Sequence, residues 1–260
     1  NVHSVRVLDG ICAQNISLQT LDGILCHNGE MELGKYQPVA YQDFDVLDQK
    51  MELCYQDKKN IGKLVPATLE GCVMRVSDII AYLGKDRQDA QKLHFFNEDP
   101  GYQNGVIGST NAEIINNMIV NIIENSYGKG YLKMDPEYFA EFSRAKTENS
   151  QLIYRDDKTN HIYEEKLNPM MEELYNKLLA DAKTMDKNSI FYRHHVEYIM
   201  EITKYAHRDE DYRETEPNMM VVDYIAAMTD DYMVDLYKYL FPKGKYEVQY
   251  RGYFDEFLFQ

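Results

Sequence analysis

The sequence predicts an all-α protein, a multi-helix bundle that ends in a short strand-like C-terminal tail. Most segments repeat apolar residues with the period of an α-helix, and several open with residues that favour helix N-termini. Only the tail KYEVQYRGYFDEFLF, residues 245–259, resembles a strand. Hydrophobic residues make up 44% of the 260, enough for a sizeable core and too much for a disordered chain. We therefore expect residues 1–260 to form a single helical domain.

The first part of the chain contains three helical segments and one insertion. SVRVLDGICAQ begins the first helix, and Ser17 is a suitable N-cap for the second, SLQTLDGILCH. Residues 28–66 are polar and irregular, so we expect a loop-rich insertion with a short helix at DFDVLDQKMELCYQDK. The third major helix covers residues 68–93, with Thr68 at its start.

The rest of the chain is expected to form longer helices. GYQNGVIGST is a glycine-rich turn region, and the apolar helix NAEIINNMIVNIIENSY that follows it ends at the glycines of GKG. Asp135 and Pro136 suit the N-cap and the first position of the next helix, and NPMMEELYNKLLADAKT repeats that opening. Two further helices are expected at SIFYRHHVEYIMEITKYAH and, as the last long helix, at PNMMVVDYIAAMTDDYMVDLYKYLF.

Composition argues against several classes of partner. The formal net charge is −15, whereas a nucleic-acid or acidic-membrane surface needs a basic stripe. None of the four cysteines lies in a CxxC pair, which argues against a structural zinc site and favours thiols in a reducing, cytoplasmic compartment. No stretch approaches the roughly 18 apolar residues that a membrane span requires.

Two acids and a phenol form a stripe on the third helix. Asp78, Tyr82 and Asp86 are spaced by four residues, so they share one helix face over about 12 Å at a rise of ~1.5 Å per residue. Their neighbours are largely apolar, and a carboxylate in such surroundings needs a partner because unpaired buried charge is costly. A divalent cation or Arg75 would supply one. On spacing alone, an Asp ion-paired with Arg or Lys is the simpler interpretation.

The histidines give weaker indications. His194 and His195 are adjacent and so point to different faces of a helix, which favours surface or core roles over metal binding. His27 ends an apolar helix, where an imidazole can meet the last carbonyls. The sequence contains no G-x-S-x-G, GxxxxGK[ST] or GxGxxG motif.

Several separated segments resemble one family. TLEGCVMRVSDIIAYLGKDRQDA resembles a helix of the HD-domain deoxynucleoside triphosphate triphosphohydrolases, the bacterial dGTPase-like enzymes. In that family, Thr-Leu-Glu-Gly is followed by an Asp, a Tyr four residues on and an Asp eight residues on. SVRVLDGI and LQTLDGILCHNG resemble the two preceding helices, and VVDYIAAMTDDYMVDLYKYLF resembles a C-terminal family segment. The resemblance covers most of the chain in the correct order and implies an HD-domain-like bundle.

The resemblance also implies an activity, metal-dependent hydrolysis of a dGTP-like dNTP to a deoxynucleoside and inorganic triphosphate. Asp78 matches an Asp that holds a divalent cation such as Mg or Mn. Tyr82 matches a residue that packs on the sugar, and Asp86 matches one that bonds the 3′-hydroxyl. Tyr224 and Asp230 belong to the C-terminal family-like segment and are further candidates for substrate binding.

The remaining metal ligands of the family, a His and a His-Asp pair, would precede NVHSVRVL. The chain is therefore expected to be the C-terminal portion of a longer protein, to need that N-terminal segment as a partner, and to be inactive alone. A homo-oligomer is also expected. The alternative is a non-catalytic nucleotide-binding or assembly module of the same fold, and a purely structural helical protein is the third hypothesis.

Overall fold

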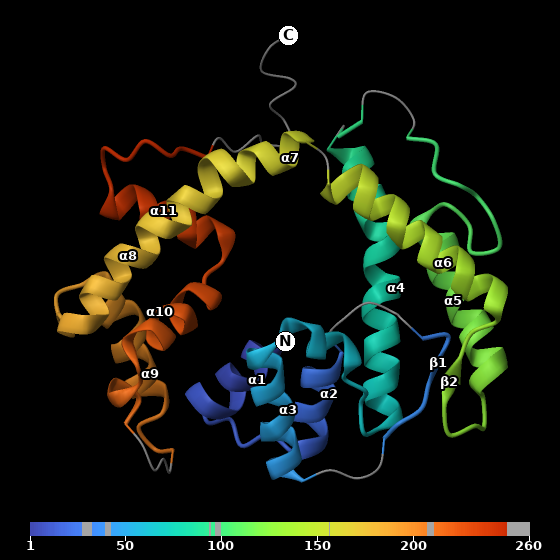
Figure 1. The fold of residues 1–260 in the computed structure, drawn as a ribbon, viewed down its shortest axis with the longest axis horizontal. Coiled ribbons are helices and arrows are strands. Elements are labelled where there is room, and N and C mark those ends of the chain that lie inside the picture. Colours follow the sequence, from blue (N-terminus) through green and yellow to red (C-terminus); the bar gives the residue numbers. More distant parts are fainter. Residues whose placement is uncertain are drawn as a thin grey trace. The chain divides into compact units, whose positions relative to one another are not determined.

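The chain is helical through most of its length, as the sequence predicts (Figure 1). This computed structural model describes residues 1–27, 33–39, 43–93, 95–96, 100–155, 157–206 and 211–248, without the side chains of 157–159. Within these residues the single sheet pairs two short antiparallel strands, β1 (Lys35–Tyr36) and β2 (Leu132–Lys133). None of the described helices is long and apolar enough to cross a membrane.

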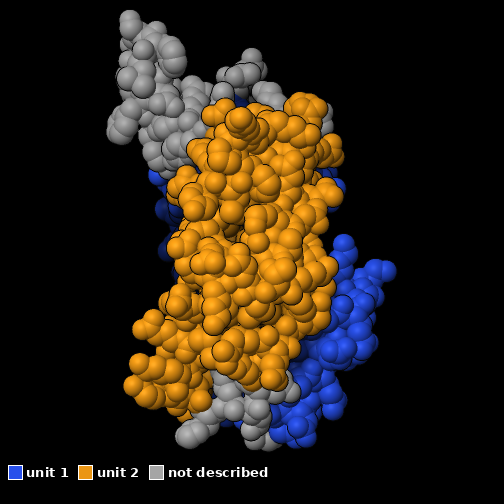
Figure 2. All heavy atoms as spheres, turned by 90° about the vertical axis from the view of Figure 1, so that its left-hand side faces the viewer, with its two compact units in different colours: residues 1–5, 16–156 blue, residues 6–15, 157–260 orange. Residues whose placement is uncertain are grey.

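The helices pack into two compact units, which Figure 2 distinguishes by colour. Unit 1 contains Asn1–Val5 and Ile16–Asp156, and unit 2 contains Arg6–Asn15 and Asp157–Gln260. The expectation of one domain over residues 1–260 stays a prediction, because two compact units can still fold as one cooperative domain.

Unit 1 confirms most of the predicted helix starts. Its α-helices are α1 (Val2–Val5), α2 (Leu18–Cys26), α3 (Phe44–Gln56), α4 (Leu69–Lys92), α5 (Asn111–Ser126) and α6 (Pro136–Asn149). Ser17 caps α2 by accepting from the backbone N–H of Thr20, and Thr68 caps α4 by accepting from that of Gly71 at 3.0 Å. The short helix predicted within residues 28–66 is α3, and a 3₁₀ turn follows it; residues 28–32 and 40–42 lie outside the described part.

The predicted N-cap position of Asp135 is confirmed, but its side chain serves another purpose. Asp135 stands at the N-cap position of α6, and Pro136 is the first residue of the helix. The Asp135 side chain makes no capping hydrogen bond. Instead, its carboxylate accepts from Asn121 Nδ2 at 2.7 Å, and its N–H donates to Asn121 Oδ1 at 3.0 Å. The Asp therefore holds α6 to α5 rather than closing the first turn of its own helix.

Unit 2 departs further from the prediction. Its α-helices are α7 (Asp157–Ile162), α8 (Asn168–Thr184), α9 (Glu197–Ile202), α10 (Pro217–Ala226) and α11 (Asp230–Leu240), with π-helical turns at Arg6–Ile11, Tyr163–Leu167 and Tyr192–Val196. α8 has the bounds predicted for its Asn-Pro segment, but no N-cap side chain closes its first turn, since Leu167 before it is already helical at φ −71° and ψ −44°. A proline at a first-turn position fits because the π-helical turn ends there.

The last long helix is in fact two helices. Thr229 caps α11 by accepting from the backbone N–H of Tyr232, and this cap separates α11 from α10. The Thr-Asp-Asp sequence at this break is typical of a helix N-terminus, with two acids in the first turn. In the strand-like tail, residues 245–248 form no strand, and residues 249–260 lie outside the described part.

The buried apolar face of α4 sets the orientation of the stripe. Val76, Ile80 and Leu83 are buried in one core with Ile114 and Met118 of α5 and with Phe142 of α6. Residues 78, 82 and 86 consequently lie toward the outside of unit 1. The four cysteines, all within the described residues, form no disulfide; three are buried and Cys12 is half-buried, as the sequence predicts.

Gly84 lets α4 and α5 approach closely. A Cβ atom at this position would lie 2.6 Å from the Cα of Asn111, which is backbone and cannot rotate away. Replacing Gly84→Ala should therefore lower the free energy of unfolding by about 1–3 kcal/mol, despite the better helix propensity of Ala. Urea denaturation measures the change. Gly130→Ala is the matched control, because nothing lies within 4 Å of its Cβ position, and it should change stability by less than about 0.5 kcal/mol. Equal effects of the two substitutions would contradict the close approach.

Candidate functional site

A cavity of about 370 Å³ in unit 1 brings the whole predicted stripe together. Its α4 wall contains Asp78, Tyr82 and Asp86, and its other wall comes from the end of α6 and the π-helical turn Ser150–Tyr154. The lining residues are Asp78, Ile79, Tyr82, Leu83, Asp86, Lys146, Asn149, Ser150 and Tyr154. The sequence predicts the first wall and misses the second.

Asp86 already has a hydrogen-bond donor. The phenol of Tyr154 donates to Asp86 Oδ2 at 2.7 Å. Burial raises the pKa of the Asp86 carboxyl, although this hydrogen bond opposes the shift, and burial together with Asp86 raises the pKa of Tyr154 to about 12. The phenol of Tyr154 therefore stays protonated at neutral pH, and its O–H group donates a hydrogen bond to the Asp86 carboxylate.

Tyr82 and Asp78 differ in their exposure. The Tyr82 side chain is 60% exposed, which leaves its ring free to contact a ligand in the cavity. Asp78 is half-buried and lies two helical turns from Asp86, about 12 Å along the axis. The two carboxylates are thus too far apart to bind one ion.

The described residues do not complete a metal site. They contain no group of three His, Cys, Asp or Glu side chains that could hold a metal ion. Metal sites built by proteins usually take three or more protein ligands, and Asp78 supplies one carboxylate. Arg75, the other partner considered for an acid on this helix, is buried and donates to the backbone carbonyls of Cys26 and Leu64.

Buried polar side chains fix the second wall of the cavity to α4. Asn149 Nδ2 donates to the carbonyl of Leu83 at 2.9 Å, and Asn149 Oδ1 accepts from Arg87 Nε at 2.9 Å. Arg87 is buried, pairs with Glu148 at 3.0 Å and stacks on the ring of Tyr102. Burial lowers the pKa of Arg87, while Glu148 counteracts this effect. These contacts place the π-helical turn, and Tyr154 with it, beside the stripe.

Lys146 and Tyr154 are the site residues that sequence reasoning missed. Both fall within the helix predicted at residues 135–154, but nothing in a linear pattern shows which face of that helix meets α4. The widened turn at Ser150–Tyr154 also changes the direction of the side chains, and such turns are frequent at functional sites. Lys146 is the one cation among the described residues that line the cavity, but the sequence alone does not show that it lies there.

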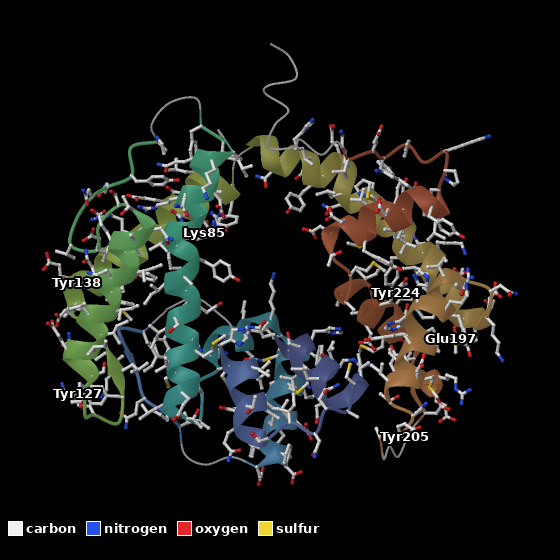
Figure 3. The ribbon with its side chains drawn as sticks, turned by 180° about the vertical axis from the view of Figure 1, so that it is seen from behind. Lys85, Tyr127, Tyr138, Glu197, Tyr205 and Tyr224 are labelled. Atoms are coloured by element: carbon white, nitrogen blue, oxygen red, sulfur yellow. The ribbon has the colours of Figure 1, made fainter. Side chains whose placement is uncertain are left out.

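Unit 2 contains a second cavity, of about 450 Å³, around Tyr224 (Figure 3). Tyr224 is buried, and its hydroxyl lies 2.6 Å from that of Tyr232. His195 stacks on the Tyr224 ring, with the ring centroids 4.9 Å apart. Asp230, the other predicted substrate contact in this segment, is exposed in the first turn of α11 and is not among the lining residues. The structure therefore does not bring Tyr224 and Asp230 into one pocket.

A chain of buried and half-buried polar groups includes two residues that line this cavity, Asp223 and His195. Arg6 donates twice to Asp223, at 2.8 Å each, and the Tyr212 hydroxyl donates to Asp223 at 3.0 Å. The same hydroxyl lies 2.7 Å from His195 Nε2. Burial lowers the pKa of His195 to about 4, although the charge of Asp223 opposes this shift. His195 is thus a neutral core residue at pH 7.

The adjacent histidines do point to different faces, as predicted. His194 is exposed, and its Nδ1 lies 2.8 Å from the Tyr232 hydroxyl, whereas His195 is buried. His27 stands at the C-cap of α2, where its backbone N–H donates to the carbonyl of Gly23. Its side chain bonds Asn1, so the prediction of an imidazole meeting the last carbonyls is not what the structure shows.

Comparisons with known proteins agree with the resemblance carried by the motifs. A family model described as a phosphohydrolase-associated domain matches residues 132–239. A deoxyguanosinetriphosphate triphosphohydrolase-like protein of Caldanaerobacter subterraneus subsp. tengcongensis is 27% identical over 233 residues. That similarity covers 83% of this chain and 62% of the relative, so the chain spans less than two thirds of the length of the protein it matches. No solved structure matches the chain.

The buried His195 should make stability depend on pH. Between pH 6.5 and about 4 the unfolded chain binds a proton on this imidazole that the folded chain does not, so stability falls as the pH falls. Between pH 7 and pH 4.5 this group alone should cost about 2–3 kcal/mol, at 1.36 kcal/mol per unit. Urea unfolding at both pH values measures the loss.

The acidic side chains also titrate in this range, so the His195 contribution is the difference between variants. His195→Gln should lose less stability on acidification than the wild type does. His194→Gln, which removes the exposed neighbour, should keep the wild-type dependence. If His195→Gln and the wild type lost the same amount, the imidazole would not be held neutral by the fold.

Proposed function

We propose that the chain is a member of the dGTPase-like HD phosphohydrolases and contributes a substrate site for hydrolysis of a dNTP, dGTP-like, to a deoxynucleoside and inorganic triphosphate; the match to a phosphohydrolase-associated domain and the similarity to a dGTPase-like protein support this proposal. The reaction is proposed to be metal-dependent and to take place in the complete protein. The observation that carries the proposal is one cavity of nucleotide-compatible size that joins Asp78, Tyr82 and Asp86 to Lys146.

The sugar is proposed to lie against the far end of the stripe. The exposed ring of Tyr82 offers an apolar face that suits a deoxyribose carbon and leaves little room for a 2′-hydroxyl. Asp86 lies one turn further along α4 and accepts a hydrogen bond from a hydroxyl in this structure, so it can accept one from a sugar. Together they would favour a deoxynucleotide over a ribonucleotide.

The phosphates are proposed to lie near Lys146. Among the described residues that line the cavity, Lys146 is the one cation. In a chain with a net charge of −15, a triphosphate needs local positive charge to offset the overall field. An ammonium serves as a point charge for phosphate oxygens without demanding a fixed geometry.

Asp78 is proposed as one ligand of the divalent cation. When bound, such an ion polarises a phosphoryl oxygen and lowers the pKa of water. The other ligands are not among the described residues of this chain, so the cation is the part of the proposal that rests on the family and not on the cavity.

Tyr224 and Asp230 are retained as weaker proposals for substrate contact. Tyr224 lines a cavity of unit 2, but its hydroxyl is hydrogen-bonded to the hydroxyl of Tyr232. Asp230 is exposed and does not line that cavity. A role for Tyr224 would require the phenol pair to open.

The alternative is a nucleotide-binding or assembly module without chemistry. Two observations favour it. The described residues do not form a metal site, and the hydroxyl of Tyr154 already donates to one carboxylate oxygen of Asp86. Nucleotide-induced thermal stabilisation without triphosphate release would support this alternative.

Two substitutions on the stripe test the leading proposal in the full-length protein. Asp78→Ala should abolish metal-dependent triphosphate release and lower the bound metal content, because it removes a ligand. Asp86→Ala should keep the metal and weaken dNTP binding about ten- to a hundredfold, which corresponds to the roughly 1.5–3 kcal/mol of a hydrogen bond to a charged acceptor. Rates with dNTP and NTP, together with metal analysis, measure both effects.

Asp89→Ala is the matched control, since Asp89 lies on the same helix, pairs with Lys85 at the surface and does not line the cavity. It should leave rates and metal content near those of the wild type. An Asp78→Ala protein that kept both its metal and its rate would make the stripe structural and remove the basis of the proposal.

A further inference from the structure

The hydroxyl of Tyr154 occupies a position from which a ligand hydroxyl could donate to Asp86. Its phenol donates to Asp86 Oδ2 at 2.7 Å, inside the cavity and beside Tyr82. A phenol and a sugar alcohol present the same group to a carboxylate, a single O–H donor on carbon. The side chain therefore reproduces, within the chain itself, the contact that the proposed substrate makes with Asp86.

Asp86 needs such a donor whether or not a ligand is present. The carboxylate of Asp86 is half-buried, and a buried acceptor left without a partner carries a desolvation penalty. Loss of the Tyr154 contact is thus unfavourable by itself. Exchange of that contact for another O–H donor conserves the number of hydrogen bonds and is close to neutral.

Tyr154 can leave without disturbing the core. Its side chain is 58% exposed and belongs to none of the buried apolar clusters. It is the last residue of the π-helical turn Ser150–Tyr154, where the N–H of Arg155 donates to the carbonyl of Ser150 at 2.9 Å. Asn149, at the base of the turn, is by contrast buried and bonded to α4. A rotation of Tyr154 toward water would leave that anchor intact.

We propose that Tyr154 is a displaceable stand-in for the 3′-hydroxyl of the substrate, so that the cavity opens Asp86 only to a ligand that brings its own O–H donor. This inference rests on the proposed function and adds a specificity-determining residue to it. A nucleotide with a 3′-hydroxyl displaces the phenol from Asp86. A nucleotide without that hydroxyl leaves the phenol in place and gains nothing from Asp86.

The test uses Tyr154→Phe in the full-length protein, because Phe keeps the ring and removes only the donor. Binding of a 2′-deoxynucleoside triphosphate and of its 2′,3′-dideoxy analogue is measured by calorimetry in EDTA, so that neither is hydrolysed. Removing the competing donor should tighten binding of the deoxynucleotide about three- to tenfold. Binding of the dideoxynucleotide should change by less than about twofold.

Two further variants isolate the cause. Tyr127→Phe alters a phenol of the same unit that is 87% exposed and lies away from this cavity, and it should change neither affinity (Figure 3). In an Asp86→Asn background, Tyr154→Phe should no longer favour the deoxynucleotide, because the two residues act through one contact. Unfolding midpoints of all variants check that the fold is intact.

Three outcomes would overturn the stand-in. Weaker deoxynucleotide binding in Tyr154→Phe would make the phenol a lasting contact of the ligand. Equal tightening for both nucleotides would point to added space instead of a freed acceptor. An unchanged affinity would mean that the phenol does not compete. In each case wild-type turnover still tests the proposed function separately, whereas a wild type that neither binds nor hydrolyses any dNTP would overturn both.

Discussion

The side chain of Asn149 determines the geometry of the candidate site, because it joins the end of α6 to the middle of α4 in a buried setting. Its amide donates to the carbonyl of Leu83, which lies beside Tyr82 in the chain, and accepts from Arg87, which follows Asp86. Each of these bonds is costly to break, since a buried amide or guanidinium would be left unpaired. These hydrogen bonds therefore fix the position of the cavity wall that contains Tyr154 relative to the α4 wall that contains the stripe.

Unit 2 is also held together by hydrogen bonds between polar side chains from distant parts of the sequence. Its polar chain of Arg6, Asp223, Tyr212 and His195 joins the segment Arg6–Ile11 to helices more than 180 residues later in the sequence. The groups satisfy one another, and the imidazole stays neutral because burial lowers its pKa to about 4. Such a network stabilises one arrangement of the unit, whereas the hydrogen bond of Asp86 in unit 1 is partly exposed and exchangeable. Two tyrosine hydroxyls thus serve opposite purposes in one chain.

Local signals in the sequence predicted what depends on local physics. The caps at Ser17 and Thr68 and the single-face stripe on α4 follow from spacing and side-chain chemistry within one or two turns. The cap at Thr229 that starts α11 is also a local signal, and the prediction of one long helix overlooked it. The use of Asp135 to bind Asn121, by contrast, depends on a side chain in another helix. Tyr154 could not be assigned to the site for the same reason, since it is 68 residues from Asp86 and meets it only because Asn149 and Arg87 pack as they do.

The partners of the α4 acids explain why one of them suits a sugar. Asp89 pairs with Lys85 one turn away at the surface, in the manner of an ordinary helical ion pair. Asp86, on the cavity side, is paired with a neutral phenol. A cation bound there would have to be displaced against its charge, and a neutral alcohol could not replace it. The hydrogen bond from Tyr154 opposes the rise in the pKa of Asp86 that burial causes, and an incoming hydroxyl would replace one O–H donor with another. The ordinary ion pair on this helix therefore involves Asp89, outside the stripe, whereas Asp86 of the stripe is paired with a phenol.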